Sequence, residues 1–445
     1  MRRALVWACL LVGACSPPEE PRGPGSASAS PAPAVEPGGA GSQEAIEDLE
    51  GAPGRWHRAA VAAPEHDARI AELEALGYAA GSEPAREGLG VVVHDPQRAQ
   101  QGLSFYTSGH GPEGLLIDMA GDVRHRWRLA ASEVWPGDPE LARLPGAVNW
   151  RRARVLENGD VVAIFAGLGI VRLTADSALV WSLRCRAHHD LDLAPDGSIW
   201  TLSRRIGVRP DVHPTEPVVD DTVLVLSPAG EVLREFSMID AFQASEFADQ
   251  ALRLDRGDLF HTNAIEVLDG RGAAGHSAFR AGNLLVSLRE PDLLAVVDPD
   301  LERVVWTHRG RFRKQHDPHL LPSGNLLLFD NLGLRERSRV LELDAETGER
   351  VWALGKQAEL SFFSGTCGTV ARLSNGNTLV CESDGGRALE VTADHDLVWE
   401  FRSPHRAGPG EQFVATLFDL QRLPADFPLD WLDGSGGGSS AATER

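Results

Sequence analysis

Three histidines recur at equivalent points of a repeated sequence pattern. His189 and His316 each lie eight residues before a turn glycine, Gly197 and Gly324, and His261 opens a strand of the same kind. A neutral imidazole can act as a nucleophile or can move a proton near neutral pH. Three such groups at matching points predict one shared site.

Polar side chains follow the same turn glycines at a second fixed spacing. Arg204, Arg289 and Asn331 each lie seven residues after a turn glycine. Guanidinium groups bind tetrahedral oxyanions such as sulfate or phosphate through paired N–H donors. With two-residue turns, His189 would face Arg204 and His316 would face Asn331 on neighbouring strands. The pattern therefore predicts an axial pocket for a tetrahedral oxyanion such as sulfate or phosphate, with histidines that can act as a covalent nucleophile or move a proton.

These residues also have simpler interpretations. A single histidine at a strand start is commonly a structural hydrogen-bonding residue, and Arg289 could pair with Glu290 or Asp292 at a sheet rim. A metal site is a further alternative, formed by His188, His189, Asp190 and Asp192. Their spacing matches no established zinc signature, so neither a metal nor another cofactor is expected.

A repeated hairpin must position these side chains. Each copy is a tight turn followed by an apolar strand, centred on Gly159, Gly197, Gly282, Gly324 and Gly376. A second recurring piece is an apolar-acidic strand that leads to Val-Trp, as at 340–352 and 388–399. Four short antiparallel strands that recur about every 40–50 residues are typical of a propeller blade.

The predicted fold class is all-β, a six-bladed β-propeller, with seven blades as the alternative count. The blades are expected at roughly 102–129, 148–184, 188–237, 259–307, 315–354 and 365–402. The first is one strand short, and either 414–423 or 91–94 is expected to complete it. The first strand of each blade lines the central channel, so the histidines should meet at one mouth.

The N-terminus is expected to be a lipoprotein signal peptide, residues 1–14. Two arginines precede an apolar stretch, residues 4–12, that is too short for a permanent membrane span. Residues 12–15, Val-Gly-Ala-Cys, match a bacterial lipobox, with an ordinary secretory signal as the alternative. Cys15 would carry the lipid, and the serine after it favours the outer membrane. The protein is therefore expected in the cell envelope, lipid-anchored and facing the periplasm.

Composition divides the remaining chain. Residues 15–43 are rich in Pro, Gly, Ser and Ala and are expected to be a disordered linker. Residues 44–89 are expected to be an N-terminal helical extension, with one helix at 68–76. The β-propeller catalytic domain is placed at 90–430, and a flexible tail at 431–445.

Cysteine content and charge narrow the partners. Once the signal is removed and Cys15 is lipidated, Cys185, Cys367 and Cys381 remain, and an odd number leaves at least one unpaired. A two-residue turn would place Cys381 opposite Val370, so no disulfide is predicted. The formal net charge of -21 argues against nucleic acid, which requires a basic face.

Several stretches resemble the bacterial aryl-sulfate sulfotransferase family. They are Ser108 to Trp127, His188-His189-Asp190, His261-Thr262-Asn263, Gln315-His316-Asp317 and Phe329-Asp330-Asn331. Their order and spacing resemble the family over most of residues 90–430. The resemblance implies a six-bladed propeller that moves a sulfuryl group from a phenolic sulfate ester to a phenol acceptor. It also implies independence of the phosphoadenosyl sulfate donor and a ping-pong route through a sulfohistidine.

The resemblance also assigns roles by position. His316 matches the covalent histidine. His189, with His188 as the alternative, and His261 match the two assisting histidines. Arg289 matches the sulfate-binding arginine. Further contacts to the substrate are expected from His188, Arg204, Asn263 and Asn331.

Two other functions stay open. Residues 343–352 resemble repeats of quinoprotein-like propellers, so the chain could be a non-catalytic binding or scaffold lipoprotein of the envelope-assembly type. It could also be a degenerate relative that binds sulfated glycans or phenols without reacting. A scaffold does not need three equivalent histidines, and the transferase is therefore the favoured hypothesis.

Overall fold

The structure, a computed structural model, describes residues 83–252, 257–273, 276–334, 337–355, 360–407 and 409–434. The expected signal peptide, Cys15, the linker and the helix at 68–76 lie outside these residues, as does the tail from 435. Residues 83–89, the end of the expected helical extension, contain no helix. Within the described ranges, no helix has the length and apolar character needed to cross a bilayer.

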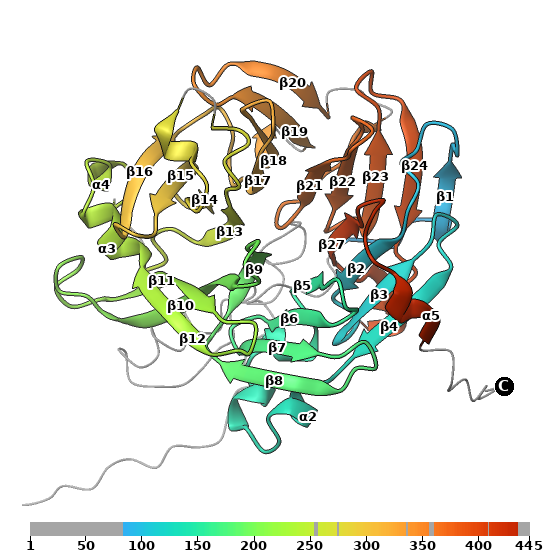
Figure 1. The fold of residues 1–445 in the computed structure, drawn as a ribbon, viewed down its shortest axis with the longest axis horizontal. Helices are drawn as coiled ribbons and strands as arrows, with labels where there is room; N and C mark the ends of the chain where they lie inside the picture. Colours follow the sequence, from blue (N-terminus) through green and yellow to red (C-terminus); the bar gives the residue numbers. More distant parts are fainter. Residues whose placement is uncertain are drawn as a thin grey trace, which may run out of the picture. The chain divides into compact units, whose positions relative to one another are not determined.

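Six antiparallel sheets surround a common centre, so the prediction of a six-bladed propeller is confirmed (Figure 1). Blade 1 consists of β27 (Leu417–Arg422), β2 (Ser104–Ser108), β3 (Glu113–Ile117) and β4 (Val123–Arg128). Blade 2 consists of β5 (Arg152–Val155), β6 (Val161–Phe165), β7 (Gly169–Leu173) and β8 (Leu179–Arg184). Blade 3 consists of β9 (His188–Leu193), β10 (Ile199–Val208), β11 (Pro217–Leu226) and β12 (Val232–Ser237).

The second half of the ring follows the same order from the centre outward. Blade 4 consists of β13 (Thr262–Val267), β14 (Leu284–Leu288), β15 (Leu293–Asp298) and β16 (Arg303–His308). Blade 5 consists of β17 (His316–Leu320), β18 (Asn325–Leu334), β19 (Arg337–Asp344) and β20 (Arg350–Leu354). Blade 6 consists of β21 (Thr369–Arg372), β22 (Thr378–Glu382), β23 (Arg387–Val391) and β24 (Leu397–Arg402).

Both candidate closing segments are used, at different places. Strand β27, near the C-terminus, is the inner strand of blade 1 and pairs with β2, as the first alternative predicted. The N-terminal strand β1 (Gly90–His94) instead pairs with β24 as a fifth, outermost strand of blade 6. The ring is therefore held at its seam by strands from both ends of the propeller.

Short helices lie between the blades or beside them. They are α2 (Ala131–Val134), α3 (Met238–Gln243), α4 (Ala248–Ala251) and α5 (Asp430–Gly434). A small hairpin of β25 (Arg406–Ala407) and β26 (Phe413–Val414) precedes β27. Helix α5 falls where the flexible tail was expected to begin. It packs on blade 1, because the ring of Trp431 lies 5.5 Å from that of Trp127 and 5.3 Å from that of His125.

Apolar side chains fill the spaces between blades, and not one central core. Six buried clusters each combine residues of two adjacent blades. The recurring tryptophans explain the Val-Trp pattern, since their indole N–H groups donate to a turn carbonyl of the next blade. Trp127 donates to Gly159 O (2.9 Å), Trp181 to Pro228 O (3.0 Å) and Trp352 to Ala393 O (3.0 Å). A blade alone would expose these faces, so the stability of each blade depends on its neighbours.

The hairpin turns contain three residues and not the expected two. Leu156 N donates to Asp160 O (2.8 Å) and Gly159 N to Leu156 O (2.9 Å), with Gly159 at φ 83. This is a type I turn that ends in a left-handed glycine, a common three-residue hairpin. The extra residue shifts the pairing by one position, so Cys381 faces Thr369 and not Val370.

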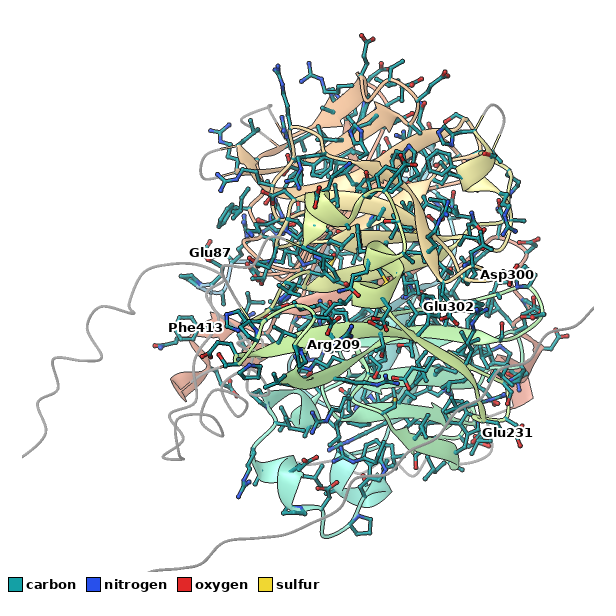
Figure 2. All side chains as sticks on the ribbon, turned by 90° about the vertical axis from the view of Figure 1, so that its left-hand side faces the viewer. Glu87, Arg209, Glu231, Asp300, Glu302 and Phe413 are labelled. Atoms are coloured by element: carbon teal, nitrogen blue, oxygen red, sulfur yellow. The ribbon has the colours of Figure 1, made fainter. Side chains whose placement is uncertain are left out.

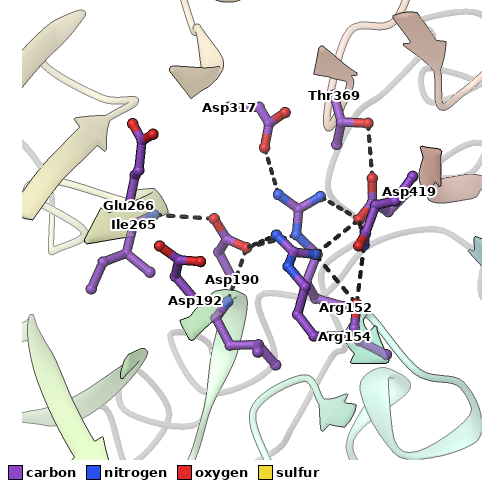
Figure 3. Close-up of polar contacts among 12 residues, drawn as sticks. Arg152, Arg154, Asp190, Asp192, Ile265, Glu266, Asp317, Thr369 and Asp419 are labelled. Atoms are coloured by element: carbon purple, nitrogen blue, oxygen red, sulfur yellow. Dashed lines mark hydrogen bonds and ion pairs between the residues drawn. The ribbon is translucent and has the colours of Figure 1, made fainter. Parts of the chain in front are cut away.

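One arginine joins the inner strands at the centre of the ring (Figure 3). Arg152 of blade 2 donates from Nε to Asp190 Oδ1 (2.6 Å) and from Nη2 to Asp317 Oδ1 (2.5 Å), and its Nη1 lies 3.0 Å from Asp419 Oδ2. These carboxylates belong to blades 3, 5 and 1. Asp190 Oδ2 also accepts Ile265 N of blade 4, and Asp317 Oδ2 accepts Val370 N of blade 6. We call Arg152 and the three aspartates the central ion network, and it involves all six blades.

The strand direction places the central site at one of the two faces of the ring. The turns that carry Glu231, Asp300 and Glu302 lie on one side in Figure 2, and Glu87 and Phe413 lie on the other. Phe413 follows β24, the fourth strand of blade 6. Because the four strands of a blade alternate in direction, the fourth strand ends on the face where the first strand begins. The first strands of blades 3, 4 and 5 therefore begin on the side of Phe413. The mouth expected for the histidines is this face.

Candidate active site

The three equivalent histidines meet at the start of adjacent inner strands. His189 and His316 lie in β9 and β17, and His261 directly precedes β13. All three are buried, and the ring centroids of His189 and His261 are 4.8 Å apart at 72°. His189 and His261 have positive φ angles of 58° and 47°, which are rare and costly for non-glycine residues. The backbone is thus strained at these two histidines.

The pairing expected for these histidines differs from the observed one. Leu202 of β10 pairs with His188, because β9 bulges between Leu191 and His188. Arg204 of β10 pairs with Asp221 of β11, on the opposite edge of the strand. The bulge turns the backbone at His189. The predicted pairing of His189 with Arg204 is therefore wrong.

His316 reaches Asn331 through its side chain and not by strand pairing. Its backbone pairs with Phe329, but its Nδ1 lies 2.8 Å from Asn331 Oδ1 and 3.0 Å from Lys314 O. The amide of Asn331 is oriented by its own donors, since Nδ2 donates to Ser364 O and Cys367 O at 2.8 Å. Asn331 Oδ1 must therefore accept, and Nδ1 of His316 carries the proton.

This tautomer leaves Nε2 of His316 with an available lone pair. Nε2 is buried and has no hydrogen-bond partner among the described residues. Burial, followed by the charge of Arg289, holds the pKa of His316 well below its usual value. The ring is therefore neutral at pH 7, and its unpartnered nitrogen has the form that a nucleophile requires.

His261 is oriented by the carboxylate of Asp258, three residues before it in the sequence. Its Nδ1 donates to Asp258 Oδ2 at 2.6 Å, and Asp258 Oδ1 accepts the backbone N–H of His261 at 3.0 Å. Burial and the charge of Arg289 lower the pKa of His261 to about 3. An imidazole held by a carboxylate at Nδ1 presents Nε2 as a base, as in catalytic dyads.

His188 contacts His189 through a hydrogen bond between the two Nδ1 atoms and so orients the ring of His189. Nε2 of His188 donates to Ser203 O (3.0 Å) and lies 3.4 Å from Asp221 Oδ1. Its Nδ1 is then an acceptor for Nδ1–H of His189 at 2.7 Å. Burial and the nearby His261 hold the pKa of His189 well below its usual value. All three site histidines thus bond through Nδ1–H and keep Nε2 as the basic atom.

The predicted arginines lie at the edge of this group. Arg289 is 9% exposed, donates from Nη1 to Glu290 Oε1 (2.5 Å), and acts on the pKa of both His261 and His316. The pairing with Glu290 that the sequence left open is therefore formed, and Lys314 also contacts Glu290, at 3.0 Å. Arg204 is close enough to affect the pKa values of His189 and Asp258.

A small cavity is lined by two of the site histidines, His189 and His316, and by Arg152 and Asp317 of the central ion network. Its volume of about 10 Å³, measured as space for the centre of a water molecule, is room for roughly one water. It is lined by Arg151, Arg152, His189, Asn263, His316, Asp317, Cys367, Gly368, Thr369 and Phe418. Asn263 donates to Gln315 O (2.8 Å), and its buried Oδ1 has no hydrogen-bond partner within the described ranges. Asn263 Oδ1 and His316 Nε2 are both acceptors, so the cavity suits a donor such as a hydroxyl group.

The described residues contain neither a disulfide nor a cluster of metal ligands. Cys185, Cys367 and Cys381 are all free thiols. No group of three or more His, Cys, Asp or Glu side chains in the described part of the chain is arranged to hold a metal ion.

The sequence reasoning missed two contributors, Arg151 and Asp258. Arg151 lies eight residues before Gly159, the same spacing that identified His189 and His316, so the signal was present. Asp258 lies three residues before His261, where an Asp-x-x-His spacing was the available signal.

The tautomer of His316 predicts a specific NMR result. A ¹⁵N-resolved spectrum should show His316 as a neutral Nδ1–H imidazole that does not titrate between about pH 5 and 8, because its pKa lies well below the ordinary value. The half-buried His308, whose pKa burial also lowers, is a reference outside the site. Titration of His316 near pH 6.5, or an Nε2–H signal, would contradict the assignment.

Comparison with known proteins gives one sequence match and many distant folds. The arylsulfotransferase (ASST) family profile matches residues 152–404. No curated protein matches the sequence. A protein of unknown function from Bacteroides caccae is 13% identical, covers 72% of this chain and 98% of its own, and has a TM-score of 0.47. BamB from Moraxella catarrhalis is also 13% identical, covers 72% of this chain and 76% of its own, and has a TM-score of 0.33.

Proposed function

The chain belongs to the arylsulfotransferase family, and from this membership we propose that it moves a sulfuryl group from a phenolic sulfate ester to a phenol. The proposed route is ping-pong, through a covalent sulfohistidine at His316, and needs no phosphoadenosyl sulfate. The observation that carries the proposal is the neutral His316 ring, whose buried Nε2 is unpartnered within the described residues.

In the first half-reaction, Nε2 of His316 attacks the sulfur of the donor. An N–S bond forms, the S–O bond breaks, and its electron pair leaves on the phenolate oxygen. Asn331 keeps the proton of His316 on Nδ1, so the ring approaches with the correct nitrogen. Arg289 supports the negative oxygens, because preorganised charges stabilise a transition state without reorganisation.

His261 is the proposed proton carrier between the two half-reactions. A bound sulfate ester favours the imidazolium, because a nearby anion raises a histidine pKa. The protonated ring gives its proton to the departing phenolate and becomes the neutral base. In the second half-reaction it takes the proton of the incoming phenol, whose oxygen attacks sulfur, and the N–S electron pair returns to His316. Asp258 holds His261 in position for both steps.

A non-catalytic binding propeller is the second candidate, and the small cavity does not separate it from the transferase. A volume of about 10 Å³ does not hold a sulfuryl group with its aryl substituent, so side chains must move before a donor can bind. The aryl part would then lie toward the mouth. A protein that binds aryl sulfates without reacting would have the same fold and the same small cavity.

The test is intact mass spectrometry of the full chain after exposure to a chromogenic phenyl sulfate. We expect the added mass of one sulfuryl group, mapped to His316, and its loss when a phenol acceptor is supplied. Thermal stabilisation by donor without adduct or turnover would select the binding propeller instead. An adduct mapped to another residue would overturn the role of His316.

A further inference from the structure

Arg151 occupies, in blade 2, the position that the site histidines occupy in blades 3 and 5. It lies eight residues before Gly159 and directly precedes the inner strand β5. It is 4% exposed and lines the central cavity together with His189 and His316. The repeat that brings the histidines together therefore also brings a guanidinium to the same cavity.

The guanidinium of Arg151 is held beside the reacting atoms. Its Cζ lies 5.0 Å from the ring centroid of Phe418, a cation–π arrangement that restrains the plane of the group. After burial and Arg289, its charge further lowers the pKa of His316. Burial raises the pKa of the Cys367 thiol, and the charge of Arg151 opposes that rise.

The neighbouring Arg152 has a different role, although it lines the same cavity. Its guanidinium contacts Asp190, Asp317 and Asp419 in the central ion network. The oxygens of Asp190 and Asp317 accept hydrogen bonds from Arg152 and from backbone N–H groups. The charge of Arg152 is therefore balanced by the floor of the cavity, and an anion at His316 requires other cations.

We propose that Arg151 is an anion-binding residue of this site, which together with Arg289 holds the sulfuryl oxygens while Nε2 of His316 meets the sulfur. The identity of the bound group rests on the proposed function, but binding of the oxyanion does not require transfer. A buried guanidinium presents N–H groups in a fixed fork, which suits two oxygens of one tetrahedral anion.

Calorimetric titration of the full chain with inorganic sulfate, at constant ionic strength, tests the proposal. Arg151→Gln should bind sulfate about 10- to 100-fold more weakly than wild type, because it loses charge-assisted hydrogen bonds. Arg151→Lys should recover part of the affinity, because it restores charge but not the fork. Arg372→Gln is the matched control, since its guanidinium also lies over an aromatic ring, 5.1 Å from Trp352, away from the cavity.

A second readout separates anion binding from a purely structural role. The pKa of His316, followed by NMR, should rise in Arg151→Gln and stay low in Arg151→Lys, which also serves if the glutamine variant fails to fold. Wild type that binds no sulfate, or Arg151 variants that bind it as tightly as Arg372→Gln, would overturn the inference. Arg151-dependent sulfate binding without turnover would overturn the proposed function alone. Turnover with an unchanged kcat/KM in Arg151→Gln would overturn this inference alone.

Discussion

His316→Ala should lower sulfuryl transfer from a phenyl sulfate by about 10⁴-fold or more, as removal of a covalent nucleophile does in other enzymes. The reason lies in Nε2 of His316, because the hydrogen bond to Asn331 fixes the ring proton on Nδ1 and leaves Nε2 unpartnered among the described residues. Initial rates with a chromogenic donor, together with intact mass, measure both the loss of turnover and the loss of the adduct.

Two further variants show whether that loss reflects the nucleophile. His261→Ala should slow the reaction by about 10²- to 10⁴-fold, the usual contribution of an acid–base group, yet still form the adduct. His308→Ala removes an imidazole that stacks on Trp306 outside the site and should keep most of the activity. Near-normal turnover in His316→Ala, or an adduct that still forms in it, would refute the sulfohistidine route.

Arg152→Met should reduce the free energy of unfolding by about 3–5 kcal/mol, the cost of breaking a buried ion pair by removing one partner. The side chains of Arg152, Asp190 and Asp419 are only 4–5% exposed, so solvent screens the abandoned carboxylates poorly. Urea unfolding at pH 7 measures the difference. Arg98→Met is the control, because Arg98 bridges Asp95 and Asp396 at the surface, where solvent screens the charges, and its loss should change the free energy of unfolding far less.

The loss of unfolding free energy in Arg152→Met should also depend on pH in a defined direction. Although burial opposes it, Arg152 lowers the pKa of Asp317 in the wild type. The stabilisation from Asp317 is therefore complete above the unfolded pKa of about 3.9 and disappears only as pH falls through the lower folded value. In Arg152→Met, Arg154 and His319 remain beside these carboxylates, but the loss of the Arg152 charge from a buried place raises the carboxylate pKa values, so protonation stabilises the variant. The gap to wild type should narrow from pH 7 to pH 4, and a gap that widens would contradict this account.

The sequence was a good guide to the fold because the propeller repeats its signals. The turn glycines recur in blades 2 to 6, and a Val-Trp or related ending recurs in each blade. The structure shows the cause of the tryptophan pattern, since indole N–H groups donate to turn carbonyls of the next blade. Closure was harder to predict. Both β1 and β27 read as possible completing strands, and only the paired sheets show that β27 enters blade 1 while β1 extends blade 6.

The spacing of the residues predicted which positions in each blade lie at the centre of the ring. It did not predict the strand register or the backbone conformation at those positions. The three-residue turns shift the register by one, and a bulge at His189 shifts it again, so pairing counted from a two-residue turn failed. Bulges have no reliable signal in a single sequence. The contacts of Arg152 were also inaccessible, because Asp419 lies far along the chain and meets Arg152 only when the ring is closed.

The late position of β27 has a consequence for how the molecule is made. Strand β2 leaves the ribosome more than 300 residues before its inner partner, since Ser104 pairs with Arg422. Until then its backbone N–H and C=O groups form an open sheet edge that can pair with another chain. Domains emerge N-terminal end first, so this hazard lasts for almost the whole of synthesis. A chain that ends before Leu417 lacks β27, so it would keep that edge permanently and would be a substrate for chaperones or proteases.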